Sequence, residues 1–84
     1  MTNEMSGELV VYGTRWCGDS QRTRRFLDRR RVTYRWVDID QDAQARAIVE
    51  RLNGGHRSVP TLVFPDGSLL VEPSEAELAA KLRM

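Results

Sequence analysis

The sequence predicts a small α/β domain, in which a four-stranded mixed sheet is flanked by three helices in the order βαβαββα. Three observations indicate this class. Short apolar and β-branched runs alternate with a helical segment along the first half of the chain, as in a β-α-β unit. Two further strand-like runs flank a turn that contains an Asp-Gly pair. The chain then ends in a segment that carries a helix-capping signature.

The first half of the chain supplies two strands and the helix between them. Residues 8–12 are largely apolar and β-branched and end at a glycine, which predicts a buried strand. Residues 21–31 are compatible with a helix whose arginines face outward, and residues 32–40 predict the second strand. The side chains expected inside this unit are Phe26, Leu27, Tyr34, Trp36 and Val37.

The second half begins with a helix and a hairpin. Residues 42–52 place apolar side chains at positions i, i+3, i+4 and i+7, and Asn53-Gly54-Gly55 is a C-terminal stop signal. Residues 61–64 and 68–71 are strand-like and flank Pro65-Asp66-Gly67, which predicts a hairpin with a tight turn. The apolar stripe of the helix consists of Ala45, Ile48, Val49 and Leu52.

The last helix completes the domain. Residues 74–77 read Ser-Glu-Ala-Glu and match the capping box, and Leu78 with Leu82 forms an inner face. A β-α-β crossover makes parallel neighbours and a hairpin makes antiparallel ones, so the sheet is mixed and helices cover both of its faces. We expect residues 1–7 to form a flexible tail and residues 8–84 to form one domain.

Length and charge exclude several classes of function. A chain of 84 residues builds one small core, which excludes a two-domain enzyme. The net charge of +1 suggests no nucleic-acid partner and we expect a monomer, although seven arginines lie between residues 21 and 36 against a single acid, Asp28. We interpret this basic stretch as a solvated face. Its arginines are Arg22, Arg24, Arg25, Arg29, Arg30, Arg31 and Arg35.

The single cysteine, Cys17, excludes an internal disulfide and a zinc site built from several thiolates. Residues 1–7 contain no apolar export signal, and no stretch approaches the roughly 18–20 apolar residues of a membrane span. We therefore expect a cytoplasmic protein with no membrane partner and no bound metal, in a compartment that keeps a lone thiol reduced.

Cys17 lies where the first strand ends and the first helix begins. Amide N–H groups and the positive end of a helix dipole favour a thiolate, which is the nucleophilic form of cysteine. Arg15 adds positive charge and Trp16 supplies an apolar wall, whereas Asp19 opposes the thiolate weakly. Cys17 is therefore a candidate for thiol–disulfide exchange.

Several segments together resemble a glutaredoxin, and within that family the mycoredoxins, which use mycothiol in place of glutathione. The resemblance extends from about residue 8 to residue 82. Its segments are Val11 to Ser20, Val37-Asp-Ile-Asp40, Asn53-Gly-Gly55, Arg57-Ser-Val-Pro-Thr61, Asp66-Gly-Ser68 and Pro73-Ser74.

The resemblance implies a thioredoxin fold in which Cys17 is the attacking residue. It also implies a cis peptide bond between Val59 and Pro60, in a loop that faces the cysteine. The backbone of Val59 would pair with an extended thiol ligand, and Arg57 would lie near the mouth of the site. The implied partners are protein mixed disulfides and a low-molecular-weight thiol, either mycothiol or glutathione.

Two residues depart from the family pattern. Ser20 replaces the second cysteine of a C-x-x-C motif, so only monothiol chemistry remains, and its hydroxyl is expected to donate a hydrogen bond to the Cys17 thiolate. Asp19 replaces an aromatic residue. The Gly-Gly-x-Asp pattern of glutathione users is also absent, and Glu72 and Glu75 stand there instead, where they oppose a carboxylate and so favour mycothiol.

Two other functions stay open. The motif Cys17-Gly-Asp-Ser20 resembles the C-G-F-S motif of monothiol glutaredoxins that carry an iron–sulfur cluster between two chains, although Asp19 would add negative charge beside that cluster. Alternatively, the basic face of residues 22–35 forms a binding module without turnover.

Overall fold

The computed structural model describes residues 8–83 and contains the seven predicted elements in the predicted order. The proposed tail of residues 1–7 lies outside the described residues. The strands are β1 (Leu9–Gly13), β2 (Tyr34–Asp38), β3 (Thr61–Val63) and β4 (Leu69–Val71). The helices are α1 (Gly18–Arg29), α2 (Ala43–Leu52) and α3 (Glu75–Leu82).

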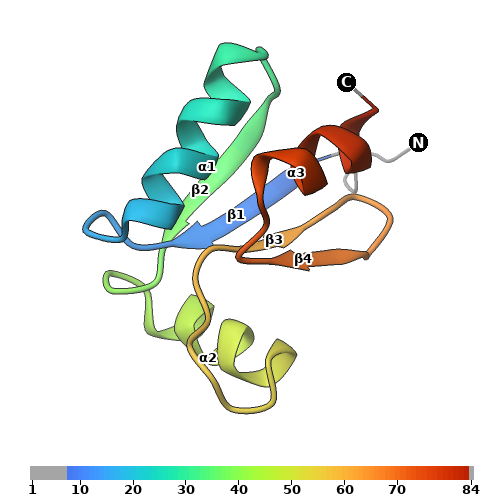
Figure 1. Cartoon of the computed structure of the whole chain (residues 1–84). Coiled ribbons are helices and arrows are strands. Elements are labelled where there is room, and N and C mark those ends of the chain that lie inside the picture. Colours follow the sequence, from blue (N-terminus) through green and yellow to red (C-terminus); the bar gives the residue numbers. More distant parts are fainter. Residues whose placement is uncertain (1–7, 84) are drawn as a thin grey trace.

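The four strands form one mixed sheet in the order β2-β1-β3-β4. β1 runs parallel to β2 and antiparallel to β3, and β4 pairs antiparallel with β3 at the edge. Helices α1 and α3 cover one face of the sheet and α2 lies on the other (Figure 1). This arrangement confirms the predicted thioredoxin-like fold class. Within residues 8–83, no helix has the length and apolar character that a membrane crossing requires.

The predicted boundaries around α1 were wrong at both ends. The helix begins at Gly18 rather than at residue 21, because its small polar residues form the first turn instead of a loop before it. It ends at Arg29, where Arg31 takes a left-handed φ of 58° and the Val32 N–H donates to the Leu27 carbonyl at 3.0 Å. Because of this turn, β2 begins only at Tyr34.

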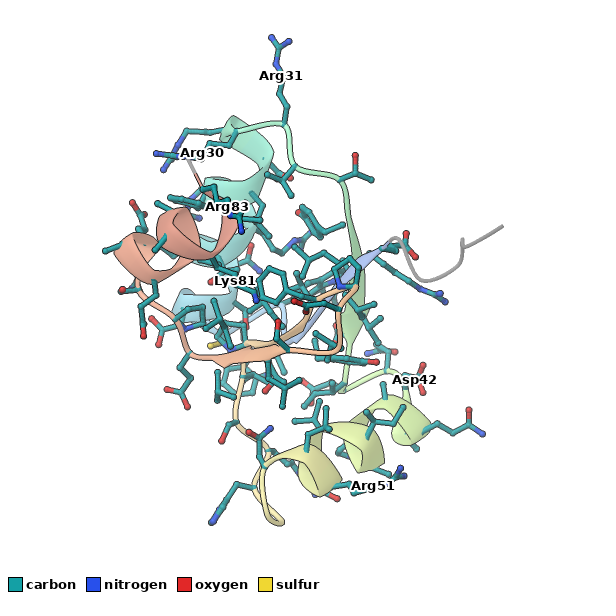
Figure 2. The ribbon with its side chains drawn as sticks, turned by 90° about the vertical axis from the view of Figure 1, so that its right-hand side faces the viewer. Arg30, Arg31, Asp42, Arg51, Lys81 and Arg83 are labelled. Carbon is teal, nitrogen blue, oxygen red and sulfur yellow. The ribbon has the colours of Figure 1, made fainter. Side chains whose placement is uncertain are left out.

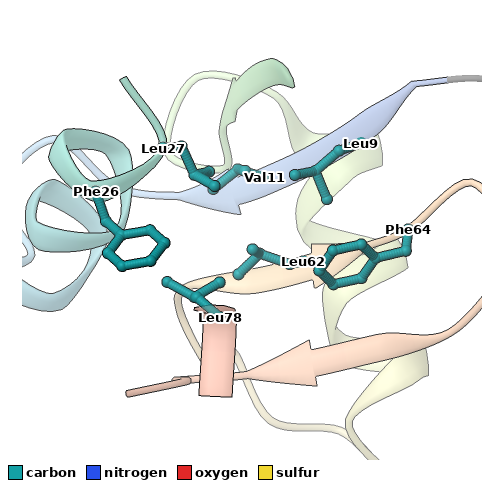
Figure 3. Packing of buried hydrophobic residues seen from close by; sticks show 7 residues of the cluster. All are labelled: Leu9, Val11, Phe26, Leu27, Leu62, Phe64 and Leu78. Carbon is teal, nitrogen blue, oxygen red and sulfur yellow. The ribbon is translucent and has the colours of Figure 1, made fainter. Parts of the chain in front are cut away.

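Most of the core lies between the sheet and the pair α1 and α3. Seven buried apolar side chains meet there, six from β1, α1, β3 and α3 and one from the residue that follows β3 (Figure 3). They are Leu9, Val11, Phe26, Leu27, Leu62, Phe64 and Leu78. A smaller cluster under α2 contains Ile39, Ala45 and Val49.

Several predicted core positions are less buried than expected, and Val37, Ile48 and Leu82 are among those that are only partly buried. Tyr34 and Trp36 are only partly buried, because β2 is an edge strand, and the Arg24 guanidinium lies 4.2 Å above the centre of the Trp36 ring. Leu52 is 40% exposed, because it is the last residue of α2 and lies beyond the edge of the small cluster.

The basic stretch is largely a solvated surface at the far end of α1. Figure 2 shows Arg30 and Arg31 at the end of the molecule that lies away from α2. Several of these side chains have local partners. Arg30 lies 3.9 Å above the centre of the Phe26 ring, where its stem covers apolar surface.

The β3–β4 turn gives a pH-dependent contribution to stability. Asp66 Oδ1 accepts hydrogen bonds from the Ser68 hydroxyl at 2.6 Å and from its N–H at 2.9 Å. These bonds lower the pKa of the Asp66 carboxyl below its ordinary value, so the folded state is stabilised above the ordinary pKa and loses this stabilisation as pH falls through the lowered one.

We therefore expect the urea midpoint of the native protein to exceed that of Asp66→Asn near pH 6, and the difference to shrink toward pH 3. Urea titrations of both proteins across this range measure it. A constant difference at every pH would contradict the assignment.

Candidate active site

The turn after β1 places Cys17 at the start of α1, as the sequence predicts. Cys17 is the N-cap residue, with extended backbone angles of φ −82° and ψ 122°, and its carbonyl accepts the first helical hydrogen bond from the Gln21 N–H at 3.1 Å. The side chain is half-buried and makes no capping bond, so the sulfur is available to a ligand. The unpaired N–H groups of the first turn belong to this end of the helix.

The loop before β3 faces the sulfur. The Val59–Pro60 peptide bond is cis, as the resemblance implies, and Cys17 Sγ lies 3.9 Å from the Val59 carbonyl oxygen. The Glu72 N–H donates to the Pro60 carbonyl at 2.8 Å, which ties this loop to the segment after β4. Cys17 and Val59 thus lie on the two sides of one site.

Two polar residues that the sequence did not indicate as site residues fix this loop. The Asn53 side-chain amide donates to Thr61 Oγ1 at 3.1 Å and to the Val49 carbonyl at 2.9 Å. Thr61 Oγ1 in turn donates to the Ser58 carbonyl at 2.6 Å. The network joins the end of α2 to the start of β3 and holds the loop opposite the cysteine. Asn53 had been interpreted only as a helix stop.

Ser20 is fully buried and lies in the first turn of α1. Its hydroxyl oxygen accepts a hydrogen bond from the Thr14 N–H at 3.4 Å. Among the hydrogen bonds of residues 8–83, none joins Ser20 to the Cys17 sulfur. Its position therefore links the turn before the cysteine to the helix after it.

Arg15 and Trp16 project from the turn between β1 and α1. Trp16 is 76% exposed, and its indole N–H donates to Asp40 Oδ2 at 2.6 Å. Arg15 is also exposed and pairs with Asp38, with 3.6 Å between Nε and Oδ2. The two aspartates follow from the topology: β1 and β2 are parallel, so the C-terminal end of β2 lies beside the turn that carries Cys17.

The remaining charges around the site are also paired. Arg57 is exposed and bonds Glu50 at 2.9 Å, which directs it toward α2. Asp19 pairs with Arg22 at 2.6 Å along the outer side of α1, so its charge opposes the sulfur less than an isolated carboxylate would.

Beyond the loop, two acidic residues stand where the sequence placed them. Glu72 is exposed and has a left-handed φ of 49°, and Glu75 begins α3 and lies 3.9 Å from Arg29. Among the described residues, no three His, Cys, Asp or Glu side chains form a group suited to a metal ion.

Comparison with known proteins explains this arrangement. Residues 9–70 match the family model described as Glutaredoxin. The chain belongs to the glutaredoxin family. A thiol at the start of a helix facing a cis-proline loop is thus the site of a thiol–disulfide oxidoreductase that acts on protein disulfides with low-molecular-weight thiols.

Relatives and solved structures agree with this membership. The "Putative glutaredoxin" of Mycobacterium tuberculosis strain H37Rv is 42% identical over 93% of each chain. Mycoredoxin 1 of Corynebacterium glutamicum is 35% identical over 88% of this chain and 91% of its own. The crystal structure of the glutaredoxin from Methanosarcina mazei Go1 superposes with a TM-score of 0.77 at 25% identity, over 94% of this chain and 81% of that one.

Proposed function

We propose that this glutaredoxin reduces mixed disulfides between proteins and mycothiol by a monothiol mechanism centred on Cys17. The observation that carries the mechanism is that the chain holds one sulfur nucleophile, at the N-terminus of α1, while a buried serine occupies the position three residues later. An internal disulfide is therefore impossible, and the second reducing equivalent comes from a second thiol molecule.

The reaction proceeds in two exchanges. The Cys17 thiolate attacks the mycothiol sulfur of the mixed disulfide, a new sulfur–sulfur bond forms, and the substrate protein leaves as a thiolate that takes a proton from water. A second mycothiol thiolate then attacks the mycothiol sulfur now bound to Cys17. This step releases oxidised mycothiol and restores the Cys17 thiolate. In the net reaction one free mycothiol is consumed: its sulfur joins the mycothiol sulfur of the mixed disulfide in oxidised mycothiol, and the substrate protein regains its thiol.

The surroundings of Cys17 support each exchange. First-turn amide groups of α1 stabilise negative charge on sulfur in both the attacking and the leaving thiolate. The loop at Val59, 3.9 Å from Sγ, offers backbone groups to an extended ligand, in the manner of an added strand. The hydrogen bonds of Asn53 and Thr61 keep that backbone in place.

The charge around the site supports mycothiol over glutathione. The two arginines expected near the mouth both bond carboxylates, Arg57 with Glu50 and Arg15 with Asp38. Glu72 adds an exposed negative charge beyond the loop. Glutathione would bring two further carboxylates to this surface, whereas the sugar part of mycothiol carries none. The similarity to Mycoredoxin 1 agrees with this choice.

The deciding experiment compares one protein substrate as its mixed disulfide with mycothiol and with glutathione, each with the matching free thiol. We expect kcat/KM to be at least about tenfold higher with mycothiol, which corresponds to about 1.4 kcal/mol in transition-state binding. Equal rates would contradict the thiol assignment. Absence of turnover with both would contradict the proposed function, and a visible iron–sulfur absorbance in the purified protein would then favour cluster carriage.

A second prediction tests the monothiol assignment. Ser20→Cys places a thiol one helical turn from Cys17, so oxidation is expected to form an intramolecular disulfide and remove two hydrogens from the intact mass. The double variant Cys17→Ser with Ser20→Cys is the matched control and is expected to keep its mass. If Ser20→Cys also keeps its mass under oxidation, the two residues do not share one face of the helix start.

A further inference from the structure

A pocket of about 320 Å³ opens beside the cysteine and takes no part in the exchange steps described above. It is lined by Arg15, Trp16, Asp38, Asp40 and Gln41. The first two come from the turn before α1 and the others from the end of β2 and the turn that follows it. The pocket therefore joins the two turns at the edge of the sheet where Cys17 lies.

Its aromatic side chain is held in place and remains open to solvent. Trp16 donates its indole N–H to Asp40 Oδ2 at 2.6 Å, yet 76% of the residue is exposed. A large aromatic ring that is anchored by its polar end and exposed elsewhere suits contact with the C–H surface of a ligand. Since 76% of the residue is exposed in the described part of the chain, a ligand gains apolar contact there.

The polar groups of the pocket favour hydroxyl groups and disfavour carboxylates. Asp38 and Asp40 supply acceptor oxygens, and Asp38 Oδ1 also accepts the Asp40 N–H at 2.9 Å, which fixes its orientation. Gln41 adds an amide that both donates and accepts. The two carboxylates outnumber the single guanidinium of Arg15, so a neutral ligand rich in hydroxyl groups fits better than an anion.

Distance along the chain connects the pocket to the reaction. Trp16 and Cys17 are consecutive residues, whose Cα atoms lie about 3.8 Å apart. A thiol ligand whose sulfur meets Cys17 and which extends toward the end of β2 therefore enters the pocket that Arg15 and Trp16 line. A pocket of about 320 Å³ is at the lower end of the size range of small-molecule sites.

We infer that this pocket is a subsite for the polyhydroxylated sugar part of the thiol co-substrate. The inference rests on the proposed function, because a thiol must first exchange at Cys17. In this arrangement Trp16 packs against a sugar ring, and Asp38, Asp40 and Gln41 accept or donate hydrogen bonds at its hydroxyl groups.

The test uses the full chain and two mixed disulfides of one protein. One carries mycothiol, and the other carries N-acetylcysteine amide, which has the same thiol end and a neutral amide but lacks the sugars. We expect a kcat/KM at least about tenfold higher with mycothiol. Trp16→Ala and Gln41→Ala are expected to raise KM for the mycothiol substrate severalfold, and so to reduce the preference for mycothiol over N-acetylcysteine amide. Gln44→Ala, an exposed glutamine on α2 outside this pocket, is the matched control and is expected to keep the preference.

A binding measurement distinguishes a failure of the proposed subsite from a failure of the proposed function. In the native chain, the sugar part of mycothiol without its cysteine is expected to shift the indole N–H signal of Trp16 saturably and to leave that of Trp36 in place. Equal rates with the two substrates, or an equal loss for both in Trp16→Ala, would overturn the subsite while the proposed function stands. If neither substrate turns over, the proposed function fails, and the indole titration alone decides whether the pocket binds sugar.

Discussion

Cys17→Ser is expected to abolish thiol–disulfide exchange and to leave the fold intact. A serine hydroxyl is not ionised near neutral pH and does not attack a disulfide, so turnover should fall to the uncatalysed background. The fold should survive because the Cys17 side chain makes no capping bond and is only half-buried. The measurements are turnover of the mycothiol mixed disulfide and the urea midpoint of the same preparation.

Ser58→Ala is a suitable comparison for this variant. It removes a side-chain hydroxyl from the facing loop, whereas the Ser58 carbonyl that accepts from Thr61 stays in place. We expect it to keep most of the activity. Turnover by Cys17→Ser within tenfold of the native rate would remove Cys17 from the mechanism, because no other cysteine in the chain takes its place.

Short local signals in the sequence were sufficient to predict most helices, strands and turns of the fold. The capping box of Ser74 and Glu77 is present with both of its hydrogen bonds, at 3.1 and 2.8 Å. The Asp66-Gly67 pair forms the predicted turn, with Gly67 at a φ of 88°. Each of these signals acts within four residues, so it can be interpreted without knowledge of the rest of the chain. Cys17 was found in the same way, from the strand and the helix on either side of it.

The pairings that complete the site join residues far apart in the chain. Trp16 and Asp40 are 24 residues apart, and the sequence predicted Trp16 as an apolar wall beside the cysteine without its partner. Arg57 was expected near the mouth of the site but bonds Glu50. The chain has 12 acidic residues, and before the fold is known many of them are equally plausible partners for an arginine. Only the register of β1 against β2 and the position of α2 select among them.

The start of α1 shows that local residue types can also mislead a prediction. Its first turn contains Gly18, Asp19 and Ser20, which are residues typical of loops and caps, so propensity placed the start of the helix too late. Part of what draws them into the helix is tertiary, because Ser20 is fully buried against the end of β1. Within the helix, Asp19 also pairs with Arg22 three residues later. Packing outweighs intrinsic propensity when the side chains are this small.

Gly13→Ala is expected to destabilise the protein by about 1–3 kcal/mol, the usual range for forcing extra atoms into a packed core. A Cβ at Gly13 would lie 2.6 Å from Ser20 Oγ and 2.8 and 2.9 Å from two atoms of the Trp36 ring. Neither neighbour moves freely, because Ser20 Oγ accepts the Thr14 N–H and the Arg24 guanidinium lies 4.2 Å from the Trp36 ring centre. Urea denaturation measures the loss.

Gly18→Ala is the matched control, since no heavy atom lies within 4 Å of the Cβ it adds. Replacing a helical glycine by alanine is expected to stabilise the protein by up to about 1 kcal/mol. The two changes add the same methyl group five residues apart, so opposite signs would isolate the contact of Gly13 with Ser20 and Trp36. If Gly13→Ala is as stable as the native chain, the end of β1 and the first turn of α1 are not closely packed. Burial of Ser20 would then fail to explain how the turn before Cys17 is held.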